Sequence, residues 1–338
     1  MHIENLEGSM GKSTVYFTDF RCPVGTSQLD KLKKVCLAAG IKNIDMDGKF
    51  VAIKMHFGEL GNLAFLRPNY AKVVADLCKE QGGMPFLTDC NTLYPGSRKN
   101  ALEHLNCAQL NGFWPMTTGC QIIIGDGLRG TDELEVPVPN GEYCKTAKIG
   151  RAIMDADIFI SLTHFKGHTQ GGFGGSNKNI GIGCADGRVG KAWIHTTPGQ
   201  DDQWDIKEEE FMERMTESTK SVVDHFGKNI TYVNVMRNMS VSCDCEGVNA
   251  APVVTPNVGI LSSTDILALD QACVDLIYAM TEAEHHDMVE RIESRHGLRQ
   301  LSYMKELGMG NNRYVLVDLD NGITAAEAVE GLKPFIAE

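Results

Sequence analysis

Residues 157–191 read DIFISLTHFKGHTQGGFGGSNKNIGIGCADGRVGK and begin with an apolar run that is typical of a buried strand. The loop that follows is rich in glycine, with nine glycines among the 24 residues from 167 to 190. Glycine is favoured where the backbone takes a positive φ or approaches another group closely. A loop after a strand of a parallel sheet lies at the carboxyl edge, where ligands of open α/β folds bind. We therefore expect this segment to carry the ligand site.

Strands and helices alternate on both sides of this segment, which predicts an α/β fold. The expected strands are 15–20, 51–57, 85–90, 121–124, 157–162, 230–235, 258–262 and 314–318. The expected helices are 26–39, 68–81, 99–110, 148–156, 206–225, 266–281, 286–307 and 325–332. We expect two lobes with mainly parallel sheets flanked by helices, one over residues 11–147 and one over 148–338. Elements can pack across this boundary, and the ligand cleft is expected between the lobes.

The charge balance excludes a generally basic surface. The chain of 338 residues has 32 Lys and Arg against 44 Asp and Glu, a net charge of −12. Nucleic acids and anionic membranes need a basic footprint, so neither is an expected partner. No run of 18 apolar residues and no N-terminal signal segment occurs, which indicates a cytoplasmic protein. The eleven cysteines are then expected as free thiols, and no Cys-x-x-Cys pair is present.

Lysine and histidine side chains gather in and beside the glycine-rich loop. Lys166, Lys178 and Lys191, together with free N–H groups of the loop, could bind an anion. His164 and His168 are four residues apart, which suits two metal ligands on a helix, although a hydrogen-bonded loop gives the same spacing. The alternative for the whole segment is a structural loop with solvated lysines.

A Cys-Asp-Cys sequence at 243–245 adds two thiols, which an extended strand would place on the same side. They could bind a soft metal or the edge of an iron–sulfur cluster, with Cys184 and a histidine completing the ligands. The alternative is two incidental thiols at a strand end. The expected metal ligands are His164, His168, Cys184, His195, Cys243 and Cys245.

Polar residues also follow two strands of the first half of the chain, at 54–59 and 89–94. Carboxyl ends of parallel strands share one edge, so these residues are expected to face the same cleft as the glycine-rich loop. Each could instead be a cap or turn residue. The expected ligand-binding residues are Lys54, Asp89, Asn91, Lys166, Asn177 and Lys191, and the expected catalytic residues are His56, His168 and Lys178.

Lys178 lies where the glycine run gives way to a more apolar stretch, which predicts the start of a short helix. An ammonium group is unfavourable at the positive end of a helix unless an anion offsets it. We therefore expect a bound anion or a covalently attached cofactor at Lys178, the alternative being a lysine that points to solvent.

Neither ATP nor NAD is expected. Gly11, Lys12 and Ser13 resemble the end of a phosphate-binding loop, but Leu6 stands where that loop needs glycine. The glycine run at 171–175 lacks the spacing of a dinucleotide-binding loop.

Several strings in order resemble the uncharacterised iron–sulfur-centre proteins (domain of unknown function 362). The strings are residues 51–62, 85–94, 126–130, 164–168, 172–179, 243–245 and 270–273. The resemblance extends from about Val15 to Leu307. Many relatives carry a two-cluster ferredoxin segment just after the position of His195, and this chain has no cysteine between Cys184 and Cys243. The resemblance thus implies the family's fold, while the ferredoxin segment is absent.

The same loop resembles that of nickel-dependent lactate racemase, in which a histidine is followed ten residues later by a lysine, as His168 and Lys178 are here. In that family the lysine carries a nickel pincer cofactor and a later histidine binds nickel. The resemblance is confined to this loop and implies a shared scaffold rather than a shared reaction.

These observations predict an enzyme that depends on a metal ion or an iron–sulfur cluster. It would act on a small anionic substrate by redox or proton-transfer chemistry in the interlobe cleft, as an oxidoreductase or a racemase-like enzyme. The alternative is a non-catalytic protein that binds a metal, cluster or ligand and partners a redox system. The expected partners are the small anion and a redox partner protein.

Overall fold

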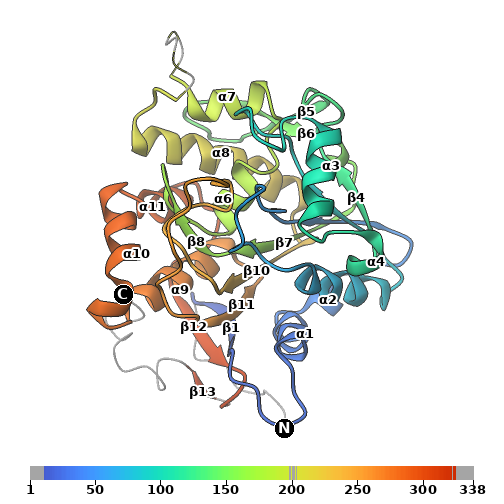
Figure 1. The fold of residues 1–338 in the computed structure, drawn as a ribbon, viewed down its shortest axis with the longest axis vertical. Helices are drawn as coiled ribbons and strands as arrows, with labels where there is room; N and C mark the ends of the chain where they lie inside the picture. Colours follow the sequence, from blue (N-terminus) through green and yellow to red (C-terminus); the bar gives the residue numbers. More distant parts are fainter. Residues whose placement is uncertain (1–10, 198, 200–201, 203, 322, 325–338) are drawn as a thin grey trace.

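A computed structural model describes residues 11–197, 199, 202, 204–321 and 323–324 (Figure 1). One sheet of nine strands runs through it, in the order β13-β12-β1-β11-β10-β7-β2-β3-β4. These strands are β1 (Ser13–Asp19), β2 (Phe50–Lys54), β3 (Met84–Asp89), β4 (Gln121–Ile124), β7 (Ile158–His164), β10 (Ile230–Met236), β11 (Gly259–Ser263), β12 (Tyr314–Asp318) and β13 (Ile323–Thr324). Two separate hairpins pair β5 (Glu133–Pro137) with β6 (Thr146–Gly150) and β8 (Lys166–His168) with β9 (Gly172–Gly174).

The main sheet is mixed and largely parallel. Strands β10, β7, β2, β3 and β4 are parallel neighbours, whereas β11 is antiparallel to both β10 and β1. The expected α/β class is therefore confirmed. The expectation of a separate sheet for each lobe is wrong, because β2 from the first half pairs with β7 from the second, with Val51 opposite Ile158. A boundary between folding units at residues 147 and 148, which lie within β6, stays a prediction.

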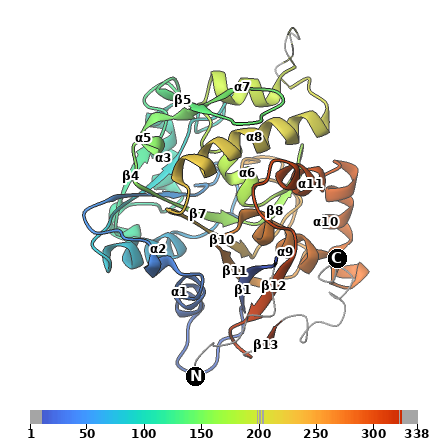
Figure 2. The same cartoon turned by 180° about the vertical axis from the view of Figure 1, so that it is seen from behind.

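Helices cover both faces of this sheet (Figures 1 and 2). They are α1 (Gln28–Ala38), the 3₁₀ helix η1 (Ile41–Asn43), α2 (Pro68–Lys79), α3 (Ala101–Leu110), α4 (Pro115–Thr118), α5 (Arg151–Met154), α6 (Ser176–Gly181), α7 (Val189–His195), α8 (Glu208–Phe226), α9 (Ile266–Tyr278), α10 (Glu282–Ser294) and α11 (Arg299–Glu306).

Alternation along β7 explains the two cores. Ile158, Ile160 and Leu162 are fully buried in one core with residues of α1 and α2. Phe159, the intervening residue, is buried in the other core with residues of α8 and α9. A strand that is covered on both faces is apolar at successive positions, as the sequence of β7 is.

Some expected elements differ from the structure. The strand expected at 51–57 ends at Lys54, and the helix expected at 148–156 is the end of β6 followed by α5. The helix expected at 286–307 is two helices, since His296 takes a φ of 52° between α10 and α11. The hairpins were not expected, and the helix expected at 325–332 lies outside the described residues. In the described part of the chain, no helix is long and apolar enough to cross a membrane.

Candidate functional site

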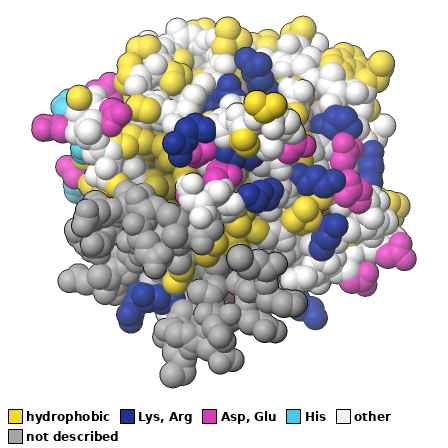
Figure 3. Space-filling view, turned by 90° about the horizontal axis from the view of Figure 1, so that it is seen from below, with side chains coloured by type: hydrophobic (Ala, Val, Ile, Leu, Met, Phe, Trp, Pro, Cys, Tyr) yellow, Lys and Arg dark blue, Asp and Glu magenta, His cyan; other side chains and the backbone are white. Residues whose placement is uncertain are grey.

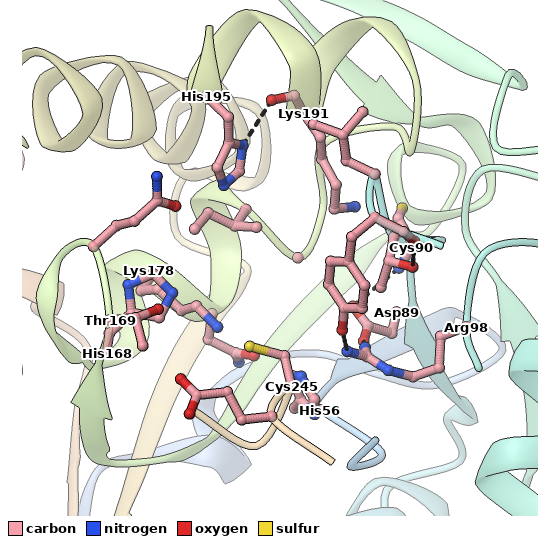
Figure 4. A pocket seen from close by; sticks show the side chains of 18 of the residues that line it. His56, Asp89, Cys90, Arg98, His168, Thr169, Lys178, Lys191, His195 and Cys245 are labelled. Atoms are coloured by element: carbon pink, nitrogen blue, oxygen red, sulfur yellow. Dashed lines mark hydrogen bonds and ion pairs between the residues drawn. The ribbon is translucent and has the colours of Figure 1, made fainter. Parts of the chain in front are cut away.

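The carboxyl ends of β2 and β3 and the loop after β7 meet at a cavity of about 390 Å³ (Figure 4). Eight of the predicted site residues line it: Lys54, His56, Asp89, His168, Lys178, Lys191, His195 and Cys245. The other six predicted residues, Asn91, His164, Lys166, Asn177, Cys184 and Cys243, do not line it. Segments that are far apart in the sequence therefore share one cavity, as their positions at strand ends predict.

One wall of the cavity carries a buried ion-pair network at the end of β3. Asp89 accepts contacts from Lys54 Nζ at 3.1 Å and from Arg98 Nη1 at 3.3 Å. Arg98 also contacts Glu59 at 3.2 Å, and Lys54 donates to Asn179 Oδ1 at 2.9 Å. Burial opposes ionisation of Asp89, but the Lys54 charge and the other cations hold its pKa below the usual range.

Lys191 differs from these cations, because no carboxylate in the described part of the chain forms an ion pair with it. Its ammonium donates to the backbone carbonyl of Ala185 at 2.6 Å. The side chain is almost fully buried and lines the cavity. A buried ammonium without a carboxylate leaves room for an anionic ligand.

Lys178 lies beside the two thiols of the Cys-Asp-Cys sequence. Its ammonium is 3.3 Å from Cys243 Sγ, and Figure 4 shows it beside the sulfur of Cys245. Burial by itself lowers the pKa of Lys178, but the Cys243 and Cys245 sulfurs more than offset this and raise it. Lys178 is therefore a cation at neutral pH.

The structure supplies an anion at the start of α6, where the sequence predicted a bound anion or cofactor. Asp270 on α9 accepts hydrogen bonds from the backbone N–H groups of Ser176 at 2.8 Å and Asn177 at 2.9 Å. Burial raises the pKa of Asp270 to about 6, so the carboxylate is ionised at neutral pH. The protein's own carboxylate thus offsets the positive helix end that carries Lys178.

The three histidines that line the cavity differ in which ring nitrogen carries the proton when the ring is neutral. Gly58 N–H donates to His56 Nδ1 and Gly171 N–H donates to His168 Nδ1, both at 2.9 Å. These two rings, when neutral, therefore carry their proton on Nε2. His195 is the reverse, since its Nδ1 contacts the Lys191 carbonyl oxygen at 2.7 Å and must donate to it. Figure 4 shows the other nitrogen of His195, a lone-pair acceptor, turned toward the cavity.

All three histidines are neutral at physiological pH. Burial lowers the pKa of His195 to about 4. Burial and then the charges of nearby cations hold the pKa values of His56 and His168 well below the usual range. The ring of His195 also packs against Trp204 and Phe211, with ring centres 5.2 and 5.1 Å away. These contacts fix the ring orientation.

His164, an expected metal ligand, has both ring nitrogens occupied. Nδ1 is 2.9 Å from the Asp244 carboxylate and Nε2 is 2.6 Å from the Arg237 carbonyl oxygen. Both ring nitrogens are therefore engaged by acceptors within the chain, and His164 does not line the cavity.

The remaining predicted residues support the cavity from outside. Asn91 donates to Asp126 at 2.8 Å, and Asn177 donates to Thr216 at 3.0 Å. Lys166 is 3.5 Å from Asp244. Cys184 is fully buried, and burial raises its pKa to about 12.

Close packing explains much of the glycine in the loop. A Cβ atom on Gly167 would lie 2.4 Å from the backbone of Val241. One on Gly183 would lie 2.3 Å from both Asn179 O and Lys54 Nζ. The glycines therefore allow the backbone at Val241 and the Lys54 side chain to approach the loop.

The structure also changes the interpretation of the Cys-Asp-Cys segment, which is a turn rather than a strand. Glu246 N–H donates to the Cys243 carbonyl at 3.0 Å, and this closes a β-turn. Asp244 points to His164, whereas the Cys243 sulfur accepts from the Lys178 ammonium.

The donor groups decide whether a metal ion or a cluster fits the site. Among the described residues, no group of three or more His, Cys, Asp or Glu side chains is arranged to hold a metal ion. The described residues therefore show no assembled metal site, and the predicted metal ion or iron–sulfur cluster stays a prediction.

Sequence reasoning missed several residues that line the cavity, among them Arg98, Asn179 and Trp204. Arg98 lies within ten residues of the end of β3, in the loop that the sequence placed at the ligand edge. The charge of Arg98 in this loop could therefore have indicated a site residue. The sequence contains no comparable signal for Trp204, since it lies far from any expected strand end.

These features define an α/β protein with a cationic, histidine-lined cavity at the carboxyl edge of a mixed sheet. Residues 51–275 match the family model described as a domain of unknown function, DUF362. The chain belongs to the DUF362 family.

Curated and solved relatives are distant. A thylakoid-associated protein of Synechocystis sp. is 26% identical over 221 residues, which cover 64% of this chain and 58% of that protein. The match thus spans less than two thirds of that relative. The lactate racemase apoprotein of Thermoanaerobacterium thermosaccharolyticum is 12% identical, covers 97% of this chain and 90% of its own, and gives a TM-score of 0.43. A protein of Thermotoga maritima is 11% identical, with 80% and 58% coverage and a TM-score of 0.41.

Proposed function

We propose that the protein is an enzyme that binds a small anion, such as a carboxylate, in this cavity and transfers a proton to or from it. The observation that carries the proposal is His195 Nε2, a neutral acceptor without a partner among the described residues, in a cavity lined by Lys54, Arg98, Lys178 and Lys191. Cations in a buried site stabilise an anionic substrate and the negative charge that develops when a proton is removed.

The histidines supply the acid and base. His195 Nε2 accepts the proton, and the hydrogen bond from Nδ1 to the Lys191 carbonyl stabilises the imidazolium that forms. A bound anion raises the pKa of His195 from its low value in the empty cavity, which makes the base stronger when substrate is present. His168 and His56 present Nε2–H donors to the same cavity.

Deuterium exchange tests the proposal. The folded protein is incubated in D₂O with a panel of small 2-hydroxy, 2-amino and 2-keto carboxylates, and loss of the α-proton signal is followed by NMR. We expect exchange with at least one member of the panel. His195→Gln is expected to abolish exchange while binding is retained, because the amide cannot take up the proton.

Lys191→Met is expected to weaken binding, measured by calorimetry, whereas Lys42→Met on the exposed η1 helix serves as the matched control. Binding without exchange across the panel would overturn catalysis and favour the alternative, a non-catalytic binding protein. No binding of any anion would overturn the proposal altogether.

The other predictions stay proposals beside this one. Metal analysis of protein purified without oxygen tests for the predicted metal ion or iron–sulfur cluster, which the proposed proton transfer by His195 does not require. All eleven cysteines are free, which supports a reducing compartment such as the cytoplasm. A redox partner protein would be sought by cross-linking.

A further inference from the structure

We infer that Cys243 and Cys245 form a redox-active dithiol that closes to a disulfide when a small-molecule disulfide enters the cavity. The proposed proton-transfer function does not use either sulfur, and this inference does not depend on it.

The turn brings the two sulfurs together. Cys243 and Cys245 are the first and third residues of the β-turn closed by the hydrogen bond from Glu246 N–H to the Cys243 carbonyl. Asp244 between them is directed away, to His164 at 2.9 Å. Residues at the first and third positions of a β-turn have their Cα atoms within the range that a disulfide spans. Disulfide formation then needs only a local change of side-chain torsion angles.

Charges around the turn favour a thiolate. The Lys178 ammonium is 3.3 Å from Cys243 Sγ, and the Lys166 ammonium is 3.5 Å from the carboxylate of the intervening Asp244. The neighbouring Cys245 thiol and then the Lys178 and Lys166 charges hold the pKa of Cys243 well below its usual range, against the effect of burial. The neighbouring Cys243 sulfur and burial raise the pKa of Cys245.

Access to the pair is from the cavity. Cys245 lines the cavity and is partly exposed, whereas Cys243 is fully buried behind it. The other buried thiols have no such arrangement: burial raises the pKa of Cys36 and of Cys184 to about 12, where thiolate is scarce.

The reaction balances with a disulfide R–S–S–R as the oxidant. The Cys243 thiolate takes the proton of Cys245, whose sulfur attacks R–S–S–R, forms a mixed disulfide and releases RS⁻. The released RS⁻ takes the proton from Cys243, whose sulfur then attacks Cys245 Sγ and releases the second RS⁻. The two cysteines lose two electrons, R–S–S–R gains them, and one RSH and one RS⁻ leave.

Closure also changes the charge beside Lys178. The disulfide carries no charge, so the thiolate that contacts the ammonium disappears. Lys178 is then free to contact an anion in the cavity, and the oxidised protein is expected to bind small anions more tightly than the reduced protein.

The test uses the full chain with Cys22→Ser as background, because Cys22 is exposed and would itself form a mixed disulfide. The reduced, folded protein is treated with glutathione disulfide. Free thiols are then counted by alkylation after unfolding, and the intact mass is recorded. We expect loss of the two thiols of this pair, with a mass decrease of two hydrogen atoms and no bound glutathione.

Two further variants identify the sulfurs. Cys243→Ser is expected to stop at a stable mixed disulfide on Cys245, because no second sulfur resolves it. Cys245→Ser is expected to react far more slowly, because the remaining sulfur is buried. If either variant fails to fold, as judged by circular dichroism, Lys178→Met provides the second test, and slower oxidation is expected.

Two results would overturn the inference. One is full retention of all thiols in excess glutathione disulfide. The other is loss of two thiols in the Cys243→Ser or Cys245→Ser protein, which would place the disulfide elsewhere. Both readouts are independent of anion binding and of proton exchange, so failure here leaves the proposed function standing.

Discussion

Two acidic groups of different kinds lie near Lys178, one at its ammonium group and one at the start of its helix. The Cys243 sulfur contacts its ammonium directly, and Asp270 neutralises the helix end on which it stands. The expectation that an anion must be present at Lys178 thus finds an explanation within the chain, although a ligand can still approach from the cavity. The side chain is nearly buried but faces that cavity.

Removing the Lys178 charge should weaken anion binding. For Lys178→Met we expect the dissociation constant of a small carboxylate to rise about ten-fold or more, since a charge-assisted contact is lost. Lys178→Arg keeps the charge and should recover part of the affinity. Calorimetry measures both, and wild-type affinity in both variants would show that Lys178 does not contact the anion.

His104 provides a pH-dependent test of burial. Burial lowers its pKa to about 3, while the unfolded chain has a value of about 6.5. Between pH 6.5 and 3 His104 is protonated in the unfolded state but neutral in the folded state. The free energy of unfolding therefore falls as the pH falls from 6.5 toward 3. This group alone should cost about 2 kcal/mol at pH 5.

His104→Leu removes this pH-dependent contribution to stability. Leucine is a suitable replacement because neither ring nitrogen of His104 has a hydrogen-bond partner among the described residues. We expect the free energy of unfolding to fall less between about pH 7.5 and 5 in this variant than in the wild type. His286→Gln on the exposed part of α10 is the control. An unchanged pH dependence in His104→Leu would show that His104 is solvated or charged.

At the scale of elements, α6 is positioned from α9. Asp270→Asn replaces a carboxylate that accepts from Ser176, Asn177 and Asn234. The amide cannot accept from all three, so we expect a loss of about 1–3 kcal/mol in stability. Because α6 carries Lys178 and Asn179, anion affinity should also fall.

Asp275 on the same helix is the matched control for Asp270. It is equally buried, burial likewise raises its pKa to about 6, and it is hydrogen-bonded to Tyr314 and Gln271 instead. Asp275→Asn should lower the melting temperature but leave anion affinity unchanged. Equal effects of the two variants on affinity would mean that Asp270 has no special role in placing α6.

The glycine-rich loop allows a comparison of two glycines. A Cβ on Gly183 would meet Asn179 O at 2.3 Å, whereas the nearest atom to a Cβ on Gly174 is 3.5 Å away. Gly183→Ala should cost about 1–3 kcal/mol of stability, because backbone must move. Gly174→Ala should be tolerated. Denaturant unfolding compares them, and equal stabilities would contradict the close approach of the loop to Lys54.

The sequence predicts the strands and long helices well because their signals are local. The apolar run of β7 and the proline that begins α2 each suffice to indicate an element. The β8–β9 hairpin was missed because its strands are three residues long and partly glycine, and it is held by the neighbouring segment 240–242 rather than by its own pattern.

The candidate site could likewise be predicted only where its signals are local. Lys54, Asp89 and His168 could be placed at one edge because each follows a strand. His164 and Asp244, which are in contact, lie 80 residues apart in the sequence. Lys178 and Cys243, also in contact, lie 65 residues apart. No local pattern encodes such contacts.

At the scale of the whole molecule, the first half of the chain depends on the second. A fragment of residues 11–147 contains β2, β3 and β4 but not β7, which pairs with β2. It would expose the edge of β2 and the buried residues that pack on it. We expect this fragment to aggregate or to lack a cooperative unfolding transition, and a soluble fragment that unfolds cooperatively would support a domain boundary at 147.

The surface in Figure 3 carries both signs of charge. Lysine and arginine side chains are interspersed with aspartate and glutamate on this face. The cations that the site uses are instead nearly buried: Lys54, Lys178 and Lys191 are at most 8% exposed. The proposed small anion would therefore be recognised by buried cations inside the molecule and not by a general surface field.

The position of β1 has a consequence for biosynthesis. Within the described residues β1 pairs with β11 and β12, whose partners for Tyr16 and Ser13 lie about 250 and 300 residues later in the chain, so its pairing carries a large loop-closure cost. Until then β1 is an unpaired apolar segment of a nascent chain. A circular permutation that places β1 after β12 would shorten the time between synthesis of β1 and synthesis of its partner strands. The yield of soluble protein after rapid expression should then rise.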